Sequence, residues 1–212
     1  MSDLRPIRLV TFDWGGVILK HHRSWAESCG SAGIDVRAGH DRTELVLRRR
    51  ALNLEFQCGR MTPEEFYPKM AAATDGLYTP EEVRRIHDAW LTEEYAGIGA
   101  VIARLVSLAS VETALLSNTN ACHWRRRADF PTANRLKHLH ASHVLGHAKP
   151  HVEIFQAFEK ATGFSGAEIL FFDDVAENVA TARGLSWRAE LIDHTGDTAA
   201  QVAGHLARYG VF

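Results

Sequence analysis

The sequence predicts an α/β fold, in which a parallel sheet carries helices on both faces and a helical cap is inserted after the first strand. Two observations carry this prediction. Short β-rich runs alternate with helix-length amphipathic stretches, and the segment from Lys20 to about Gly97 contains helix starts but no convincing strand. Alternating strands and helices favour a parallel sheet covered on both faces. With 212 residues, 46% of them hydrophobic, the chain can form one core and a smaller lobe.

Four β-rich runs are the expected strands. They are IRLVTFD at 7–13, VETALLS at 111–117, EILFFDD at 168–174 and WRAELID at 187–193. Short apolar and β-branched runs bounded by turn residues are typical of buried strands. The segment 129–151 fits neither strand nor helix well, and we expect loops around a short strand or turn there.

Three helix starts in the inserted segment share one signature. Ser24, Thr62 and Thr79 each precede a glutamate by three positions, so the hydroxyl is expected to cap the helix while the glutamate reaches back. The two threonines are followed by proline, whose missing N–H does no harm at the first helical position. A fourth helix is expected over 42–57, closed by Gly59.

These elements divide the chain into a split core and an insertion. We expect a core domain formed by 1–19 and 98–212 and a helical cap domain over 20–97. The glycine-bearing junctions WGGV at 14–17 and AGIGA at 96–100 lie at or near the two borders, where they are candidate hinges.

Charge and composition argue against several classes of function. A formal net charge of −2 and a pI near 6.6 supply no global basic field for nucleic acid or anionic membranes. The N-terminus has no long apolar segment before its first charges, and no run is long enough to span a bilayer, so we expect a cytoplasmic protein. The cysteines, Cys29, Cys58 and Cys122, are widely spaced without a CxxC pattern, which favours reduced thiols.

Two arginine runs and a histidine cluster are the other marked features. RRR occurs at 48–50 and at 125–127, and we interpret each as a solvated helix face, with a phosphate-facing role for one arginine as the alternative. Five histidines lie within 138–151, but their spacing fits no familiar ligand pattern, so we expect no metal there.

Polar side chains stand where the expected strands end. The first strand ends at Asp13, the second at Ser117 and Asn118, and the third at Asp173 and Asp174. Parallel pairing would bring them to one edge of the sheet, and ligands of open α/β sheets bind outside the carboxyl ends of the strands. A single aspartate at such a position often only caps the following helix. The whole set, however, indicates a site.

Four motifs in order make the signal specific. FDWGGV at 12–17, LLSNTN at 115–120, GHAKPHVEIF at 146–155 and ILFFDDVAENVATARGL at 169–185 resemble the motifs of the haloacid dehalogenase superfamily. This resemblance implies a Rossmann-like core, with the insertion at the place of the family's helical cap. The chain looks most like a bacterial sugar-phosphatase branch related to glucose-1-phosphate phosphatase, whose first motif also has the form FD-x-G.

The resemblance implies a magnesium-dependent phosphatase that works through an aspartyl-phosphate. Asp13 would be the nucleophile. Asp13, Asp174 and the backbone carbonyl of Gly15 would bind Mg²⁺, which prefers oxygen ligands, and Asp173 would orient these ligands.

The remaining roles concern the phosphoryl group and the metal loop. Ser117 and the backbone of Asn118 would hydrogen-bond the phosphoryl oxygens, and Lys149 would balance their charge in the transition state. Glu177 and Asn178 are expected to start the next helix or to hold the metal loop. The expected substrate is a small phosphorylated metabolite, with sugar phosphates as candidates and with neither nucleic acid nor membrane as a partner.

Gly15 stands where most phosphatases of the superfamily have a second aspartate, which protonates the leaving group. Such proton transfer is worth roughly 10²- to 10⁴-fold in rate. Three explanations are open: His21 or His22 supplies the proton, the leaving group is a halide as in 2-haloacid dehalogenases, or the chain binds without catalysing. The aspartate pair 173 and 174 favours phosphate over halide, because those dehalogenases need no magnesium and lack the pair. The retained nucleophile, lysine and metal carboxylate argue against loss of catalysis.

Specificity is expected to depend on cap side chains that approach the leaving group. Trp25, the arginines 48–50 and Phe56 are candidates, although packing is the commoner role of such residues. Closure of the cap over Asp13 would exclude water and select the substrate.

Overall fold

A computed structural model describes residues 6–212, so residues 1–5, which belong to the predicted core domain, lie outside its described part. Its centre is a five-stranded sheet in the order β5-β4-β1-β6-β7, and every neighbouring pair is parallel. The strands are β1 Leu9–Phe12, β4 Glu112–Ser117, β5 His138–Ala141, β6 Ile169–Asp173 and β7 Arg188–Leu191. The four predicted strands are present, each slightly shorter than expected, and β5 is the short strand expected within 129–151.

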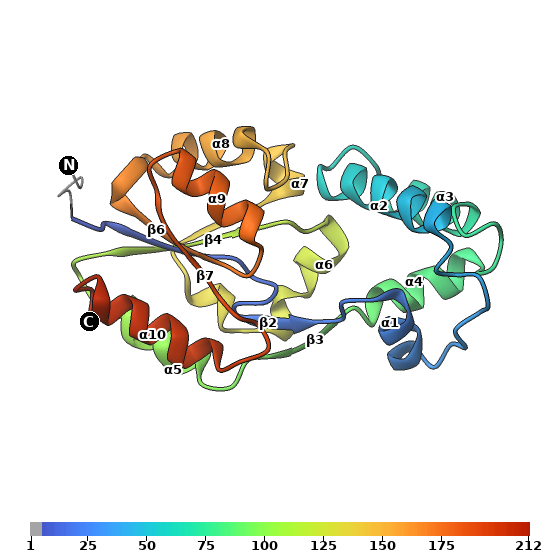
Figure 1. Ribbon diagram of the computed structural model, residues 1–212, viewed down its shortest axis with the longest axis horizontal. Coiled ribbons are helices and arrows are strands. Elements are labelled where there is room, and N and C mark those ends of the chain that lie inside the picture. Colours follow the sequence, from blue (N-terminus) through green and yellow to red (C-terminus); the bar gives the residue numbers. More distant parts are fainter. Residues whose placement is uncertain (1–5) are drawn as a thin grey trace.

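Helices cover both faces of this sheet (Figure 1), which confirms the predicted α/β fold class. On one side lie α8 Val152–Thr162 and α9 Ala176–Gly184, and on the other α5 Ile98–Val106 and α10 Thr198–Arg208. Successive residues of β6 alternate between the two apolar layers: Phe171 packs with α8 and α9, and Phe172 with α5 and α10. This alternation follows from the pleat of a strand.

Four helices form a lobe beside the core (Figure 1): α1 Trp25–Ala32, α2 Thr43–Gln57, α3 Pro63–Ala72 and α4 Pro80–Asp88. They share an apolar cluster of their own. Ser24, Thr62 and Thr79 each accept the backbone N–H three positions on, as predicted, and the two threonines complete capping boxes. At the first start, Glu27 accepts instead from the N–H of Arg23. The division into two domains stays a prediction.

The inserted segment is not purely helical, contrary to the sequence-based expectation. β2 Leu19–His21 and β3 Leu91–Glu94 form an antiparallel two-stranded ribbon that joins the lobe to the core (Figure 1). Both strands are very short, and neither has a strict apolar alternation, so periodicity gives no signal. Their pairing depends on residues at opposite ends of the insertion.

The lobe contacts the core through short helices on the core side, α6 Ala121–Arg125 and α7 Ser142–Leu145. His87 of α4 stacks on His123 of α6 with ring centroids 3.8 Å apart. The Nε2 of His123 donates to the His87 carbonyl, 2.8 Å away, and the Nδ2 of Asn120 lies 3.1 Å from the His87 Nε2. Burial lowers the pKa of both histidines, that of His123 to about 4, so the pair is neutral near pH 7. The remaining helical turns are 3₁₀ helices at Arg126–Asp129, Ala133–Arg135 and Gly166–Glu168.

None of the helices in the described region is both long enough and apolar enough to cross a membrane.

Candidate active site

Three carboxylates meet at the carboxyl edge of the sheet. Asp13 follows β1, Asp173 is the last residue of the neighbouring strand β6, and Asp174 follows it. The N–H of Asp13 donates to the Phe172 carbonyl, 2.8 Å away, so the strand pairing continues up to the site. One oxygen from each carboxylate lies within 4.8 Å of the others. The predicted convergence of these strand ends is therefore present.

Lys149 lies buried between two of these carboxylates. Its Nζ is 3.1 Å from Asp13 Oδ1 and 2.6 Å from Asp173 Oδ2, and it donates to the Leu116 carbonyl at 2.9 Å. Burial alone would lower the pKa of Lys149, but Asp13 and Asp173 together hold it above its usual value. The lysine is therefore charged and balances the negative charge of the site.

Asn118 positions this lysine, a role that the sequence analysis missed. Its side chain accepts the N–H of Lys149 at 2.8 Å and donates to the Lys149 carbonyl at 2.7 Å. Two such bonds fix the loop between α7 and α8 against the loop after β4. The spacing of the two motifs along the chain contains no signal for this pairing.

Asp173 accepts four hydrogen bonds from three donor groups. Its Oδ1 accepts from the Val175 N–H at 2.8 Å and from Asn178 at 2.9 Å, and its Oδ2 accepts from Lys149 at 2.6 Å and from Asn178 at 3.0 Å. Asn178 thus holds the loop, one of the two expected roles. Glu177 is exposed in the first turn of α9. With its oxygens occupied, Asp173 is suited to orienting other groups more than to direct contact with a ligand.

Asp13 is buried, and its ionisation is unusual. Burial, opposed by Lys149 and reinforced by the charges of Asp173 and Asp174, raises the pKa of Asp13 to about 7. A concentration of negative charge that raises a carboxyl pKa is a place where a bound cation is favourable.

Gly16 allows Asp174 to approach the turn after β1. Its φ is +77°, and a Cβ at this position would lie 2.2 Å from Asp174 Cγ, so no other residue fits. The Oδ2 of Asp174 accepts from Arg23 Nη1 at 2.7 Å. Arg23, which the sequence analysis did not select, therefore neutralises part of this charge.

The imidazole of His21 fills the space beside Gly15. A Cβ on residue 15 would lie 2.8 Å from His21 Cδ2 and 3.0 Å from His21 Nε2. The Nδ1 of His21 is 2.8 Å from the His22 carbonyl, which only accepts, so Nδ1 carries a proton and Nε2 is the variable position. Burial lowers the pKa of His21.

His22 points elsewhere. Its Nε2 lies 2.7 Å from the Ser31 hydroxyl and its Nδ1 3.7 Å from the Glu27 carboxylate. His21 lines a cavity beside the three carboxylates, and His22 does not.

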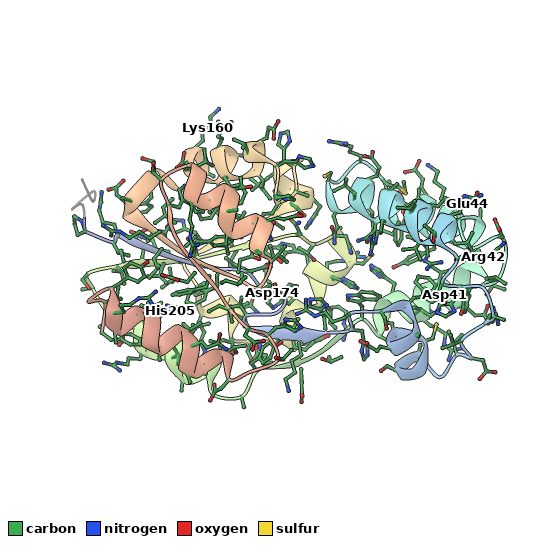
Figure 2. All side chains as sticks on the ribbon, in the orientation of Figure 1. Asp41, Arg42, Glu44, Lys160, Asp174 and His205 are labelled. Atoms are coloured by element: carbon green, nitrogen blue, oxygen red, sulfur yellow. The ribbon has the colours of Figure 1, made fainter. Side chains whose placement is uncertain are left out.

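A cavity of about 630 Å³ extends from this edge of the core into the lobe. Asp13, Ser117, Asn118 and Asp174 line its core side, and Figure 2 shows Asp174 where the core meets the lobe. A cavity of this size suits a small metabolite.

The specificity candidates separate into two groups. Trp25, Arg49 and Arg50 line the cavity, whereas Arg48 and Phe56 do not. Phe56 instead stacks on Phe66, with ring centroids 4.1 Å apart, inside the lobe.

Comparisons with known proteins identify a family and two related phosphatases. A profile of the haloacid dehalogenase-like hydrolase family matches residues 7–185. D-ribitol-5-phosphate phosphatase of Bacteroides thetaiotaomicron is 27% identical over 208 residues, covering 87% of this chain and 97% of that enzyme. Phosphatase MT3486 of Mycobacterium tuberculosis is 40% identical over 70 residues, which are 33% of this chain and only 32% of that protein.

Solved structures share the fold. The HAD family enzyme bt-2542 of Bacteroides thetaiotaomicron superposes with a TM-score of 0.77 at 21% identity, over 93% of this chain and 99% of that one. A structure of the same enzyme in complex with magnesium and inorganic phosphate has a TM-score of 0.72 at 20% identity, with coverages of 92% and 98%.

Proposed function

Since this chain belongs to the haloacid dehalogenase-like hydrolases, we propose that it is a magnesium-dependent phosphatase of a small phosphorylated metabolite, acting through an aspartyl-phosphate intermediate. One observation carries the proposal: Asp13 lies with Asp173, Asp174 and the buried Lys149 at one end of a cavity suited to a metabolite. Two relatives named as phosphatases, and magnesium with phosphate in a structural neighbour, support it.

The donor set fits a magnesium ion. Asp13 and Asp174 offer carboxylate oxygens within 4.8 Å of each other, and Gly15 adds its carbonyl from the same turn. Mg²⁺ prefers such oxygen ligands and would offset the repulsion between carboxylate and phosphate. Asp173, whose two carboxylate oxygens each accept two hydrogen bonds, would hold the loop that carries Asp174.

The chain's own groups would carry out the displacement. An oxygen of Asp13 forms the new bond to phosphorus while the bond to the leaving oxygen breaks, and water later cleaves the acyl phosphate and regenerates Asp13. Lys149 would stabilise the charge on the transferring group. Ser117, whose side chain lines the cavity, and the backbone of Asn118 would hydrogen-bond the phosphoryl oxygens.

The departing oxygen needs a proton, and His21 is placed to supply it from Nε2 when both ring nitrogens are protonated. Because burial lowers the pKa of His21, this form is favoured at lower pH. Its ring occupies the space where a residue-15 side chain would stand, and Nε2 is the position at which it can hold or release a proton. Of the two histidines considered from the sequence, the geometry favours His21, because the ring of His22 is hydrogen-bonded outside the cavity.

Replacing His21 with asparagine should lower kcat/KM for alkyl phosphates by roughly 10²-fold, the usual worth of proton transfer. The loss should be much smaller for p-nitrophenyl phosphate, whose leaving group departs without a proton. Steady-state kinetics of both substrates measure the difference. His22→Asn is the matched control. Equal losses on both substrates, or the same pattern in the control, would contradict the role of His21.

The proposed activity is tested by phosphate release from a panel of sugar and small-metabolite phosphates, with magnesium and then with excess chelator. We expect release that disappears with the chelator and returns when magnesium is restored. Absence of release from every ester would overturn the proposal, and chloride release from 2-chloropropionate would then identify a dehalogenase. A sugar phosphate as the substrate, the glucose-1-phosphate phosphatase-like branch and a cytoplasmic location stay predictions.

A further inference from the structure

Arg49 of α2 is a buried cation for which residues 6–212 provide neither a hydrogen-bond acceptor nor an ion-pair partner. Its exposed fraction is 8%, and it lines the cavity from the lobe side. Among residues 6–212 no side chain or carbonyl accepts a hydrogen bond from its guanidinium, and its Nη1 is fully buried. The prediction of a solvated arginine face therefore holds for the exposed Arg48 and Arg50 but is wrong for Arg49.

Neighbouring arginines of the lobe have carboxylate partners. Arg42 and Arg48 both pair with Asp75, and Arg37 pairs with Glu82. These pairs are at least partly exposed. The charge of Asp41, which also lines the cavity, acts on Arg49 without forming an ion pair with it. A buried ion without a partner is costly, and burial lowers the pKa of Arg49, although a guanidinium remains charged. Such a cost is understandable if a ligand supplies the missing acceptor.

Arg49 is held in place by stacking on an aromatic ring rather than by an ion pair. Its guanidinium carbon lies 5.0 Å from the centre of the Trp25 ring, which also lines the cavity. Stacking on an aromatic face fixes the plane of the guanidinium while its N–H groups stay available. The residue is therefore preorganised for a planar or tetrahedral oxyanion.

Most of the same helix face is also polar. Residues three or four positions apart on a helix share a face, and the cavity-lining residues of α2 follow that spacing. They are Val46, Arg49, Arg50, Asn53 and Gln57. Within the described chain, Asn53 and Gln57 are likewise left without a side-chain hydrogen bond. A face with this composition suits a hydroxylated, anionic molecule better than an apolar one.

We propose that the leaving group of the substrate carries a second anionic group, a carboxylate or a second phosphate, which binds Arg49. This inference rests on the proposed phosphatase activity. It assigns the binding of the leaving group to the lobe end of the same cavity. It makes the preferred substrate a phosphorylated acid or a bisphosphate.

Matched pairs of esters test the proposal. For the carboxylate, 3-phosphoglycerate is compared with glycerol 3-phosphate. For the second phosphate, fructose 1,6-bisphosphate is compared with fructose 6-phosphate and ribulose 1,5-bisphosphate with ribulose 5-phosphate. In at least one pair, the wild type should show a higher kcat/KM for the member with the second anionic group. The ratio of the two kcat/KM values measures this preference. In Arg49→Met that ratio should fall by about 10- to 100-fold, the worth of a charge-assisted hydrogen bond. Arg48→Met, on the same helix but outside the cavity, should keep the wild-type ratio.

A stability measurement separates binding from a structural role. Because the ion is buried and unpaired, Arg49→Met, which keeps the aliphatic packing, should unfold at the wild-type temperature or higher. A drop of several degrees would show that the guanidinium holds the lobe together and would overturn the proposal.

The outcomes distinguish the two hypotheses. If phosphate esters are hydrolysed and no pair shows a preference that Arg49→Met removes, the phosphatase activity stands and the proposed anion site is wrong. If no ester at all is hydrolysed, including p-nitrophenyl phosphate, the proposed activity fails, and calorimetric binding of the same pairs in magnesium decides the site. The anion site is supported if Arg49→Met weakens the binding of a member with the second anionic group by about 10- to 100-fold. Absence of binding overturns the site.

Discussion

Replacing Asp13 with asparagine is expected to abolish phosphate release, with kcat reduced by at least about 10⁴-fold, as for the loss of a covalent nucleophile. The amide is nearly isosteric but does not form the acyl phosphate. The surroundings should persist, because the backbone N–H of residue 13 still donates to Phe172 and Gly16 still leaves room for Asp174. Phosphate release with magnesium, together with thermal unfolding, is the measurement.

Asp35→Asn is the matched control for this variant. Asp35 is exposed in the loop after α1 and does not line the cavity, so its loss should leave the rate unchanged. If Asp13→Asn kept a substantial part of the activity while the wild-type rate needed magnesium, the attack on phosphorus would come from water. The proposed aspartyl-phosphate intermediate would then be wrong, although the proposed phosphatase activity would stand.

Replacing Lys149 with methionine should reduce both stability and activity. Lys149 joins Asp13 and Asp173 by ion pairs in which its own side chain is fully buried. Removing one partner of a buried ion pair typically lowers the free energy of unfolding by about 3–5 kcal/mol. Loss of the positive charge of Lys149, which would stabilise the transferring group, should cost about 10²- to 10³-fold in kcat as well. Urea unfolding in excess chelator measures the first effect and phosphate release the second.

Lys160→Met controls for the removal of a lysine. Lys160 is exposed on α8, at the outer edge of the core in Figure 2. Its loss should change stability by no more than about 0.5 kcal/mol. If Lys149→Met unfolded at the same urea concentration as Lys160→Met, the buried ion pairs would contribute no net stability, and the proposed charge balance would be wrong.

Much of the fold was predictable because its signals are local. A strand that is buried on both faces reads as an apolar run, as in Ile169–Asp173, and the helix starts at Thr62 and Thr79 are short-range hydrogen-bond patterns. The β2–β3 ribbon was missed because its strands are too short for periodicity and because its pairing is long-range.

The convergence of the site residues was predictable for a topological reason. Parallel strands end at one edge of a sheet, so residues at the carboxyl ends of β1, β4 and β6 must meet there, which brings Asp13, Ser117 and Asp173 together. Lys149 was selected only by its resemblance to a family motif. Its position between two carboxylates depends on one hydrogen bond donated and one accepted by Asn118, a residue on another loop.

By itself, the sequence determined the parallel α/β core, the family and the residues that gather at the strand ends, because adjacent residues encode period, caps and motif order. Only the tertiary structure decided which histidine stands beside Gly15 and which arginine of the run 48–50 is buried. Burial and hydrogen-bond partners depend on segments far apart in the chain, and three identical side chains in a row differ only in the direction that the helix gives them.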